Sequence, residues 1–201
     1  MSSTRALVLA IAALVGSVLW IVVHRPVTHA AGVIAPDIPL QQPVDGTPPS
    51  LHKKDIAITP LATFSITARV LSRADYRWDT AAAISPTDLA LGWGRMSDTA
   101  VLDKIDISQS VRFYFWRVRE FPIPQNEIIE SSANMHLIPA DDTVAREIDH
   151  VKQGDVVTFD GYLIEAHWPN GGIWRSSLTR TDTGAGACEV VWVERFSIAP
   201  R

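Results

Sequence analysis

The chain of 201 residues carries a formal net charge of −4, and 47% of its residues are hydrophobic, so it is able to bury a core. A single cysteine, Cys188, excludes an intrachain disulfide, a c-type haem attachment site and a Cys/His zinc pattern. Residues 55–201 hold fourteen Lys or Arg against twenty Asp or Glu. This acidic balance disfavours nucleic-acid binding, which depends mostly on the neutralisation of phosphates.

The first predicted element is an apolar stretch from Ala6 to Val23 that contains no charged residue. As a helix rising about 1.5 Å per residue it would be roughly 27 Å long, close to the hydrocarbon thickness of a bilayer. We therefore expect residues 6–23 to be a transmembrane anchor in the lipid bilayer. A cleaved signal peptide is the alternative, which the long apolar stretch and the basic His24-Arg25 pair that follows it disfavour.

The residues around this span indicate its orientation. Residues 1–5 form a very short tail, and a short tail ahead of a signal-like span usually stays in the cytoplasm, although the basic residues on the two sides are nearly balanced. We therefore expect a bacterial inner-membrane protein with a single pass and a periplasmic C-terminal domain.

A proline-rich segment follows the span. Residues 24–54 contain six prolines and show no helical periodicity. Because proline fixes φ and lacks a backbone donor, the segment is expected to be a stiff, extended linker. It would separate the anchor from a globular domain at residues 55–201.

The first strand of that domain is predicted at residues 63–71 (TFSITARVL). Its apolar side chains alternate with Ser65, Thr67 and Arg69, which is the period of a half-buried strand. These three polar side chains are therefore expected on the solvent-facing side.

Two short helices are predicted next. Ser85 followed by Pro86 is a typical helix start, and Gly92 would end this helix within two turns. A second helix is expected from an Asp98 cap to about Ile105. Both helices would be inserted between strands.

An aromatic strand, VRFYFWRV at residues 111–118, is expected to be central in the sheet or covered by the helices. Residues 121–140 are expected to be extended, because their prolines forbid a long helix. A helix capped by Asp142 is expected at residues 143–151.

The C-terminal region predicts three adjacent antiparallel strands at residues 156–168, 173–180 and 187–198, separated by turns rich in glycine. With the two earlier strands, this makes a mainly β, α+β domain, and the best fold prediction is a partly open, OB-like antiparallel barrel of five strands. The alternative is an antiparallel sheet with helices on one face.

Four blocks resemble one protein family: ALGWG at residues 90–94, SANMHLIPA at residues 132–140, WRSSL at residues 174–178 and DTGAGACE at residues 182–189. They are similar to an uncharacterised family of bacterial proteins with one N-terminal transmembrane segment. The resemblance implies a bacterial envelope protein and supplies no activity and no catalytic residues.

Cys188 and His136 are the candidate nucleophile and base of a thiol-dependent enzyme. Glu189 or Asp182 would orient the imidazole of His136. A cysteine entering a β-strand is, however, more often a small core residue, and no catalytic signature surrounds this one.

Further candidates could bind a ligand. Trp93 lies between two glycines, and Ser132 and Asn134 are small polar residues near His136. Arg175 and Ser177 lie on a predicted strand, and Asp182 is an acidic residue in the turn that follows it. Trp93 is more simply read as a core residue beside a turn, and Arg175 as the partner of an acid. No metal site and no cofactor are predicted.

Two hypotheses about function follow. The favoured one is a non-catalytic, membrane-anchored module that binds a protein partner or other ligand in the bacterial envelope. The alternative is a small hydrolase or transferase that uses Cys188 and His136. Oligonucleotide binding through the barrel face ranks last, because the domain is acidic.

Overall fold

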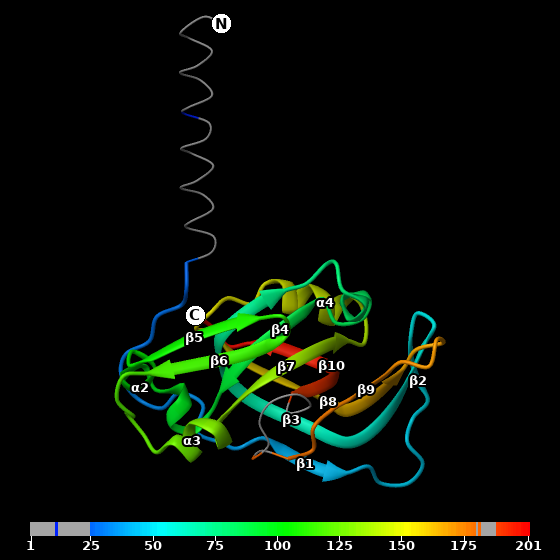
Figure 1. The fold of residues 1–201 in the computed structure, drawn as a ribbon, viewed down its shortest axis with the longest axis horizontal. Helices are drawn as coiled ribbons and strands as arrows, with labels where there is room; N and C mark the ends of the chain where they lie inside the picture. The colour runs from blue at the N-terminus through cyan, green and yellow to red at the C-terminus, as the bar shows by residue number, and fades with distance from the viewer. Residues whose placement is uncertain (1–10, 12–24, 180, 182–187) are drawn as a thin grey trace, which may run out of the picture.

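The computed structural model describes residues 11, 25–179, 181 and 188–201, and its fold is mainly β with short helices (Figure 1). This confirms the predicted fold class. The strands are β1 (Leu40–Pro43), β2 (Leu51–Lys53), β3 (Ile56–Asp75), β4 (Thr87–Gly92), β5 (Ile105–Ser110), β6 (Phe113–Val118), β7 (Ser132–Pro139), β8 (Val156–His167), β9 (Ile173–Arg175) and β10 (Glu189–Ile198). The helices are the 3-10 turns η1 (Thr80–Ala83) and η2 (Gly94–Ser97) and the α-helices α2 (Thr99–Leu102), α3 (Gln125–Glu130) and α4 (Asp142–Asp149).

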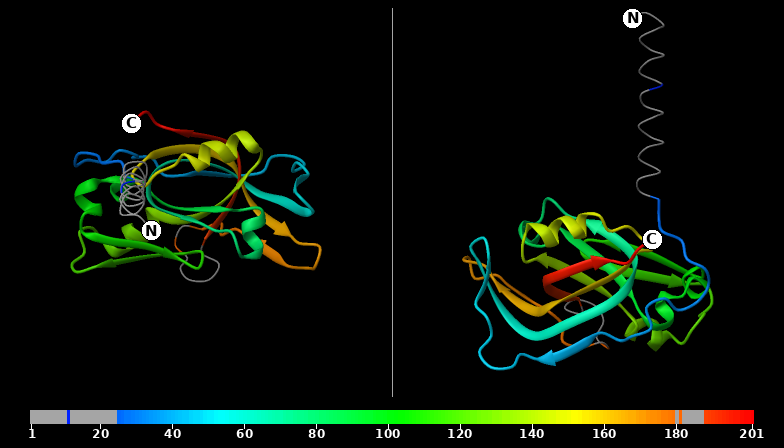
Figure 2. Two further views of the ribbon diagram at one scale, coloured as in Figure 1. Left: turned by 90° about the horizontal axis from the view of Figure 1, so that it is seen from above. Right: turned by 180° about the vertical axis from the view of Figure 1, so that it is seen from behind.

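Five strands form a sheet that curls back on itself in the order β3-β4-β7-β10-β8, with β8 also pairing with β3 (Figures 1 and 2). The long strand β3 makes this possible, since its first part pairs with β8 and its last part with β4. Alternating residues of β3 point into the resulting core, where Phe64 and Ile66 are buried. The sheet is therefore partly closed around one apolar interior.

One pair in this sheet departs from the predicted antiparallel arrangement. β10 runs parallel to β7, with Val190 opposite His136, while its other edge is antiparallel to β8. The chain between β7 and β8 includes α4, which packs Val144 and Ile148 onto the core. The meander prediction is also wrong in one respect, because β9 pairs only with the end of β8.

The aromatic stretch predicted as a central strand lies elsewhere. β6 pairs with β5 in a separate two-stranded sheet that lies beside the barrel (Figure 2). Its inward side chains, Tyr114 and Trp116, pack on a second apolar cluster with Leu71 and Met96. The outward side chains Phe113 and Phe115 remain exposed. Both faces of β6 carry bulky side chains, but only the face with Tyr114 and Trp116 packs on a described apolar cluster.

The helix predicted from Ser85 is wrong. Residues from Thr87 onward form β4, which pairs with β3 on one edge and β7 on the other. All six residues of β4 are buried, and a strand buried on both faces reads as a continuous apolar run rather than an alternation. Strand pairing has overridden the local helix-start signals.

The other helix predictions fare better, although the strand β7 was not predicted. Asp98 caps α2 as expected, and α4 lies where a helix was predicted, although Asp141 rather than Asp142 accepts the cap hydrogen bonds. Residues 121–140 are not simply extended, since they contain α3 and β7. Of the five strands of the curled sheet, β4 and β7 are therefore the two that the sequence did not predict.

Residues 24–54 were expected to form a linker, but their described part, residues 25–54, lies along the curled sheet. β1 and β2 both pair with β3, and the backbone N–H of Val27 donates to the carbonyl of Gln153. Gly154 has a φ of +89°, and a Cβ there would lie 2.0 Å from the carbonyl oxygen of Val27. Only glycine allows this close approach.

The predicted membrane anchor, residues 6–23, lies outside the described residues except for Ile11. In the part of the chain that the structure describes, no helix has the length and apolar character needed to cross a bilayer.

Candidate functional site

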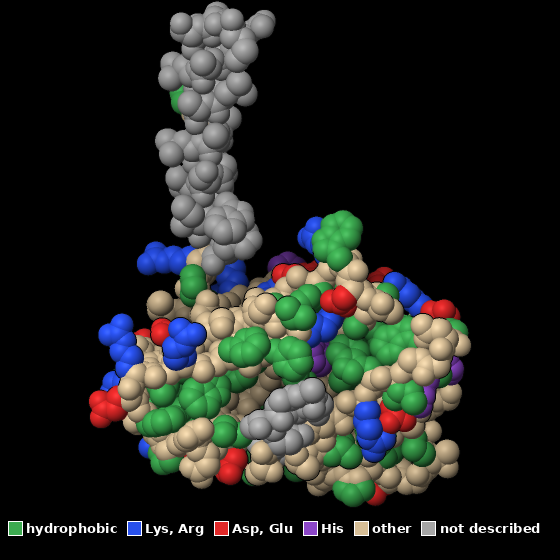
Figure 3. All heavy atoms as spheres, in the orientation of Figure 1, with side chains coloured by type: hydrophobic (Ala, Val, Ile, Leu, Met, Phe, Trp, Pro, Cys, Tyr) green, Lys and Arg blue, Asp and Glu red, His purple; other side chains and the backbone are tan. Residues whose placement is uncertain are grey.

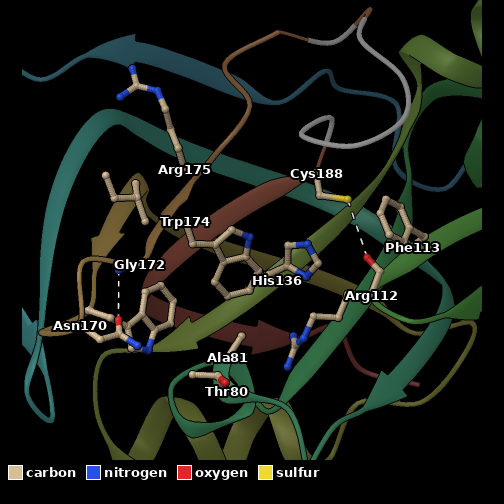
Figure 4. Close-up of a pocket in the computed structure, with 12 residues that line it drawn as sticks. Thr80, Ala81, Arg112, Phe113, His136, Asn170, Gly172, Trp174, Arg175 and Cys188 are labelled. Atoms are coloured by element: carbon tan, nitrogen blue, oxygen red, sulfur yellow. Dashed lines mark hydrogen bonds between the residues drawn. The ribbon is translucent and has the colours of Figure 1, made fainter.

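A pocket of about 470 Å³ opens on the face that carries the tip of the β5–β6 hairpin and β9 (Figure 4). Four parts of the chain supply its walls: η1, the hairpin tip, β7 and the segment from β8 to β10. The residues that line it are Thr80, Ala81, Arg112, Phe113, His136, Trp168, Asn170, Gly172, Ile173, Trp174, Arg175 and Cys188.

A buried ionic group lies beneath the pocket. Asp88 on β4 is fully buried, and its two carboxylate oxygens lie 2.9 Å from His136 Nδ1 and 3.0 Å from Arg112 Nη1. Asp88 and His136 are direct partners in the register of β4 and β7, which fixes the two side chains side by side. A carboxylate on Nδ1 orients an imidazole and leaves Nε2 for other contacts.

Arg112 reaches Asp88 because the hairpin tip has a special backbone. Val111 and Arg112 have φ values of +49° and +63°, and together they form the two-residue loop between β5 and β6. Left-handed residues at both positions match the twist of a tight hairpin, but valine is poorly suited to this conformation. Backbone strain of this kind persists only where surrounding contacts hold it.

The contacts that hold this tip converge on Arg112. Its guanidinium binds Asp79 with two nitrogens, donates to the carbonyl of Ser85 and lies 4.2 Å from the ring centroid of Tyr76. Its backbone N–H donates to the Tyr76 hydroxyl. The Arg112 guanidinium lowers the pKa of Asp79, so the carboxylate stays charged and the tip stays docked.

Aromatic rings form the main wall of the pocket. The ring of Trp174 lies 4.7 Å from that of His136 and 6.3 Å from that of Trp168, measured between centroids. Figure 4 shows Trp174 and His136 next to each other at the centre of the site. Phe113 and Ile173, which are 38% and 64% exposed, lie at its edge. Figure 3 shows hydrophobic side chains gathered on this face of the molecule.

Cys188 lines the same pocket, but its thiol points to the hairpin. The sulfur lies 3.9 Å from the carbonyl oxygen of Arg112 and 4.0 Å from Asn134 Nδ2. Asn134 itself donates to the Arg112 carbonyl and accepts from Gln109. In its contacts with described residues, the thiol therefore packs with Asn134 against the backbone of the hairpin tip.

The cationic side chains of the pocket are neutralised by carboxylates. Arg112 pairs with Asp79 and Asp88, and Arg175 lies 2.6 Å from Glu165. The hydrogen bond from Arg175 lowers the pKa of Glu165, which keeps that pair charged on both sides. Arg175 also points away from the Trp174–His136 pair (Figure 4). The pocket is therefore mainly apolar, with its charges already satisfied.

The predicted site residues divide into two groups. His136, Cys188, Asn134 and Arg175 meet at or beside the pocket. The remaining candidates lie elsewhere or have other roles, and they are Trp93, Ser132, Ser177, Glu189 and Asp182.

Trp93 is 1% exposed and lies in the main core, where the sequence predicted a core residue beside a turn. The hydroxyl of Ser132 donates to the carbonyl of Ile128 on α3. Ser177 is buried and its N–H donates to the carbonyl of Cys188, and Glu189 is 1% exposed in β10. Asp182 lies outside the described residues.

Asp88 and Arg112 were not among the residues predicted for the site. Asp88 takes the orienting position that Glu189 or Asp182 was expected to fill. It was hidden because residues 85–88 were interpreted as a helix start. The left-handed backbone at Arg112 has no sequence signal, since neither Val111 nor Arg112 is a usual residue for such a turn.

Comparisons of this chain with protein-family models, with curated proteins and with solved structures find no match. Among the described residues, no group of three or more His, Cys, Asp or Glu side chains is arranged to hold a metal ion.

Proposed function

We propose that this protein is a non-catalytic binding module of the bacterial envelope, which takes a neutral apolar side chain of a partner protein into the pocket beside Trp174. The observation that carries the proposal is the pocket itself, since it combines aromatic walls with ionic groups that are already paired. Binding sites are typically concave and mainly apolar, with a few fixed polar groups.

The charge balance selects the class of ligand. An anionic ligand gains most from a free cation, but both arginines of the pocket face carboxylates. A neutral aromatic or aliphatic group needs only apolar contact and ring stacking, which Trp168 and Trp174 offer. Phe113 and Ile173 at the edge would contact the chain around the inserted side chain. Nucleic acid is not the proposed partner, because phosphates would meet an acidic domain.

The position of the pocket agrees with an OB-like barrel, which we propose as the finer description of the fold. In such barrels, the second and third strands and the loops after the first and fourth strands form the binding face. Here β4 and β7 supply Asp88 and His136, the β3–β4 loop supplies Thr80, and the chain after β8 supplies Trp174.

The membrane assignment is part of the same proposal. Residues 6–23 would anchor the chain in the bacterial inner membrane by a single pass, with the domain in the periplasm. The charge-free apolar stretch and the short tail ahead of it support this. A reporter fused after Arg201 tests it: a reporter active only in the periplasm is expected to work, and one active only in the cytoplasm would contradict the orientation.

Two probes test the ligand class on the ¹⁵N-labelled full-length protein in a maltoside detergent. N-acetylphenylalaninamide is neutral and apolar, and phenyl phosphate carries a similar ring with an anion. We expect the neutral probe to shift the indole N–H resonance of Trp174 at lower concentration than the anionic probe. The reverse order, or no shift with either probe, would contradict the proposed ligand class.

One observation favours a second function, a thiol-dependent hydrolase or transferase. His136, whose Nδ1 lies 2.9 Å from Asp88 Oδ2, lines the same pocket as Cys188, and an imidazole paired with a carboxylate is the group that would activate a thiol. It ranks second because the contacts of the thiol with described residues run to the Arg112 carbonyl and Asn134. Loss of function in a Cys188→Ala variant that still binds the neutral probe would favour the enzyme.

A further inference from the structure

A second site lies outside the pocket, around Arg69 on β3. Arg69 is 8% exposed, and among the described residues its hydrogen bonds come from Nη1, which donates to the carbonyl of Ser97 and the hydroxyl of Thr99. Within the described residues, no carboxylate lies within salt-bridge distance of the guanidinium. A buried charge without an ion pair is costly, so Arg69 calls for an explanation.

Arg69 is buried, although the alternation of β3 predicts that its side chain faces solvent. Ser65, Thr67 and Arg69 share the outer face of β3, and the alternation of the strand predicts that all three face solvent. Ser65 and Thr67 are half-buried, whereas Arg69 is covered by η2 and the start of α2. Thr99 also donates to the carbonyl of His29, which ties the segment after Pro26 to the same place.

A cavity of about 270 Å³ opens beside this arginine. Its walls come from residues 26–29, β3, α2, β5 and the turn before β8, and its polar groups besides Arg69 are Thr28, His29, Thr99, Asp103 and Gln153. The docked segment is held there by Gly154, whose carbonyl lies 2.7 Å from His29 Nε2. The cavity is therefore a built part of the fold with a buried cation in its wall.

We propose that this cavity binds a phosphate-type oxyanion on the free side of the Arg69 guanidinium. The Nε and Nη2 donors of arginine form a planar fork that matches two oxygens of a phosphate. An anion there would neutralise a buried charge for which the described residues provide no ion pair. Because residues 26–29 directly follow the predicted membrane span, a phospholipid headgroup and a free phosphate are two sources of the same chemistry.

Asp103 is the opposing charge in the cavity. It is exposed and attracts Arg69 from beyond salt-bridge distance. Burial lowers the pKa of Arg69, while Asp103 and Asp98 act in the opposite direction. A bound anion would be repelled by Asp103, so removal of this carboxylate should strengthen anion binding. If Asp103 is instead the natural partner of Arg69, its removal should not create tighter binding.

The experiment measures binding by calorimetry with the full-length protein in a maltoside detergent, which contains no phosphate. The two probes are inorganic phosphate and dioctanoyl phosphatidylglycerol, each at constant ionic strength. Binding of at least one probe is expected. The tighter probe identifies the source, free anion or lipid headgroup, and either result supports the site.

Four variants decide whether the binding is at this cavity. Arg69→Gln removes the cation, and Leu102→Trp fills the cavity while it leaves Arg69 in place, so each should weaken binding about tenfold or more. Asp103→Asn should tighten it severalfold. Arg195→Gln, at an exposed arginine on β10, should leave it unchanged.

No binding of either probe by the wild-type protein would overturn the proposal, and so would equal losses in the Arg69→Gln and Arg195→Gln variants. If Arg69→Gln does not fold, Leu102→Trp and Asp103→Asn still decide. Unchanged binding in Leu102→Trp, or weaker binding in Asp103→Asn, would contradict the site.

Discussion

Asp88 and His136 lie directly opposite each other on the neighbouring strands β4 and β7, with 2.9 Å between Asp88 Oδ2 and His136 Nδ1. Both side chains are buried, and the second oxygen of Asp88 faces Arg112 from the hairpin tip. One carboxylate thus joins the curled sheet to the hairpin and lies against the imidazole in the pocket wall.

The first prediction concerns this carboxylate. Asp88→Asn removes the negative charge and leaves Arg112 with Asp79 alone. Breaking one partner of a buried ion pair costs about 3 kcal/mol, so the free energy of unfolding should fall by roughly that amount. Denaturant unfolding of the purified protein measures it. Asp106→Asn, at an exposed residue of β5, is the control, and an equal loss in the control would contradict the role of Asp88.

The second prediction concerns the strained hairpin tip. Val111 has a φ of +49° and is 78% exposed, so its side chain contributes little burial. Val111→Asn should stabilise the protein by roughly 0.5–1 kcal/mol, since asparagine adopts left-handed backbone more readily. The same denaturant measurement applies. A loss of stability would mean that the valine side chain makes contacts that outweigh the backbone strain.

The third prediction concerns acid stability. Burial alone would raise the pKa of Asp155, but hydrogen bonds from Arg201 and the Lys152 N–H outweigh burial and lower it. A lowered pKa means that the folded state favours the carboxylate. Its contribution to stability is therefore full above the unfolded pKa of about 3.9 and is lost as pH falls through the lower folded value.

Arg201→Gln tests this relationship. It should lower the free energy of unfolding at pH 7 by about 1 kcal/mol, because the guanidinium is partly exposed. The difference from wild type should shrink below about pH 4, as Asp155 becomes protonated in both proteins. Arg119→Gln serves as the exposed control. A difference that stays constant down to pH 2 would contradict the assignment to Asp155.

The fourth prediction separates the two proposed functions. If the protein is a binding module, Cys188→Ala should change affinity for the neutral probe less than about threefold, since the contacts of the thiol with the described residues Arg112 and Asn134 are weak. The NMR titration described above measures this affinity. If the variant instead abolishes the activity of the protein in cells while the affinity stays intact, the thiol-dependent alternative gains support.

The sequence predicts the fold class and several elements for clear physical reasons. The alternation at residues 63–71 predicts the middle of β3, and Asp98 provides the cap signal of α2. β4 was misread because a strand paired on both edges and buried on both faces has no alternation, while Ser85 and Pro86 resemble a helix start. Long-range pairing decides such segments, and local signals cannot show it.

The site could be predicted only in part. His136 and Cys188 carry recognisable chemistry, so they were found, and the structure places both in one pocket. Asp88 depends on the register of β4 with β7, and Arg112 depends on a left-handed turn that its residues do not favour. The covering of Arg69 depends on the packing of η2 and α2 over one end of β3.

The most direct measurement for the central claim is a comparison of two tryptophan variants in the titration with N-acetylphenylalaninamide. Trp174 lies in the pocket wall, whereas Trp78 is 97% exposed and does not line the pocket. The indole resonance of Trp168 reports binding in both variants. We predict that Trp174→Ala weakens the affinity at least tenfold and that Trp78→Ala leaves it unchanged. Unchanged affinity in Trp174→Ala would contradict the proposed binding pocket.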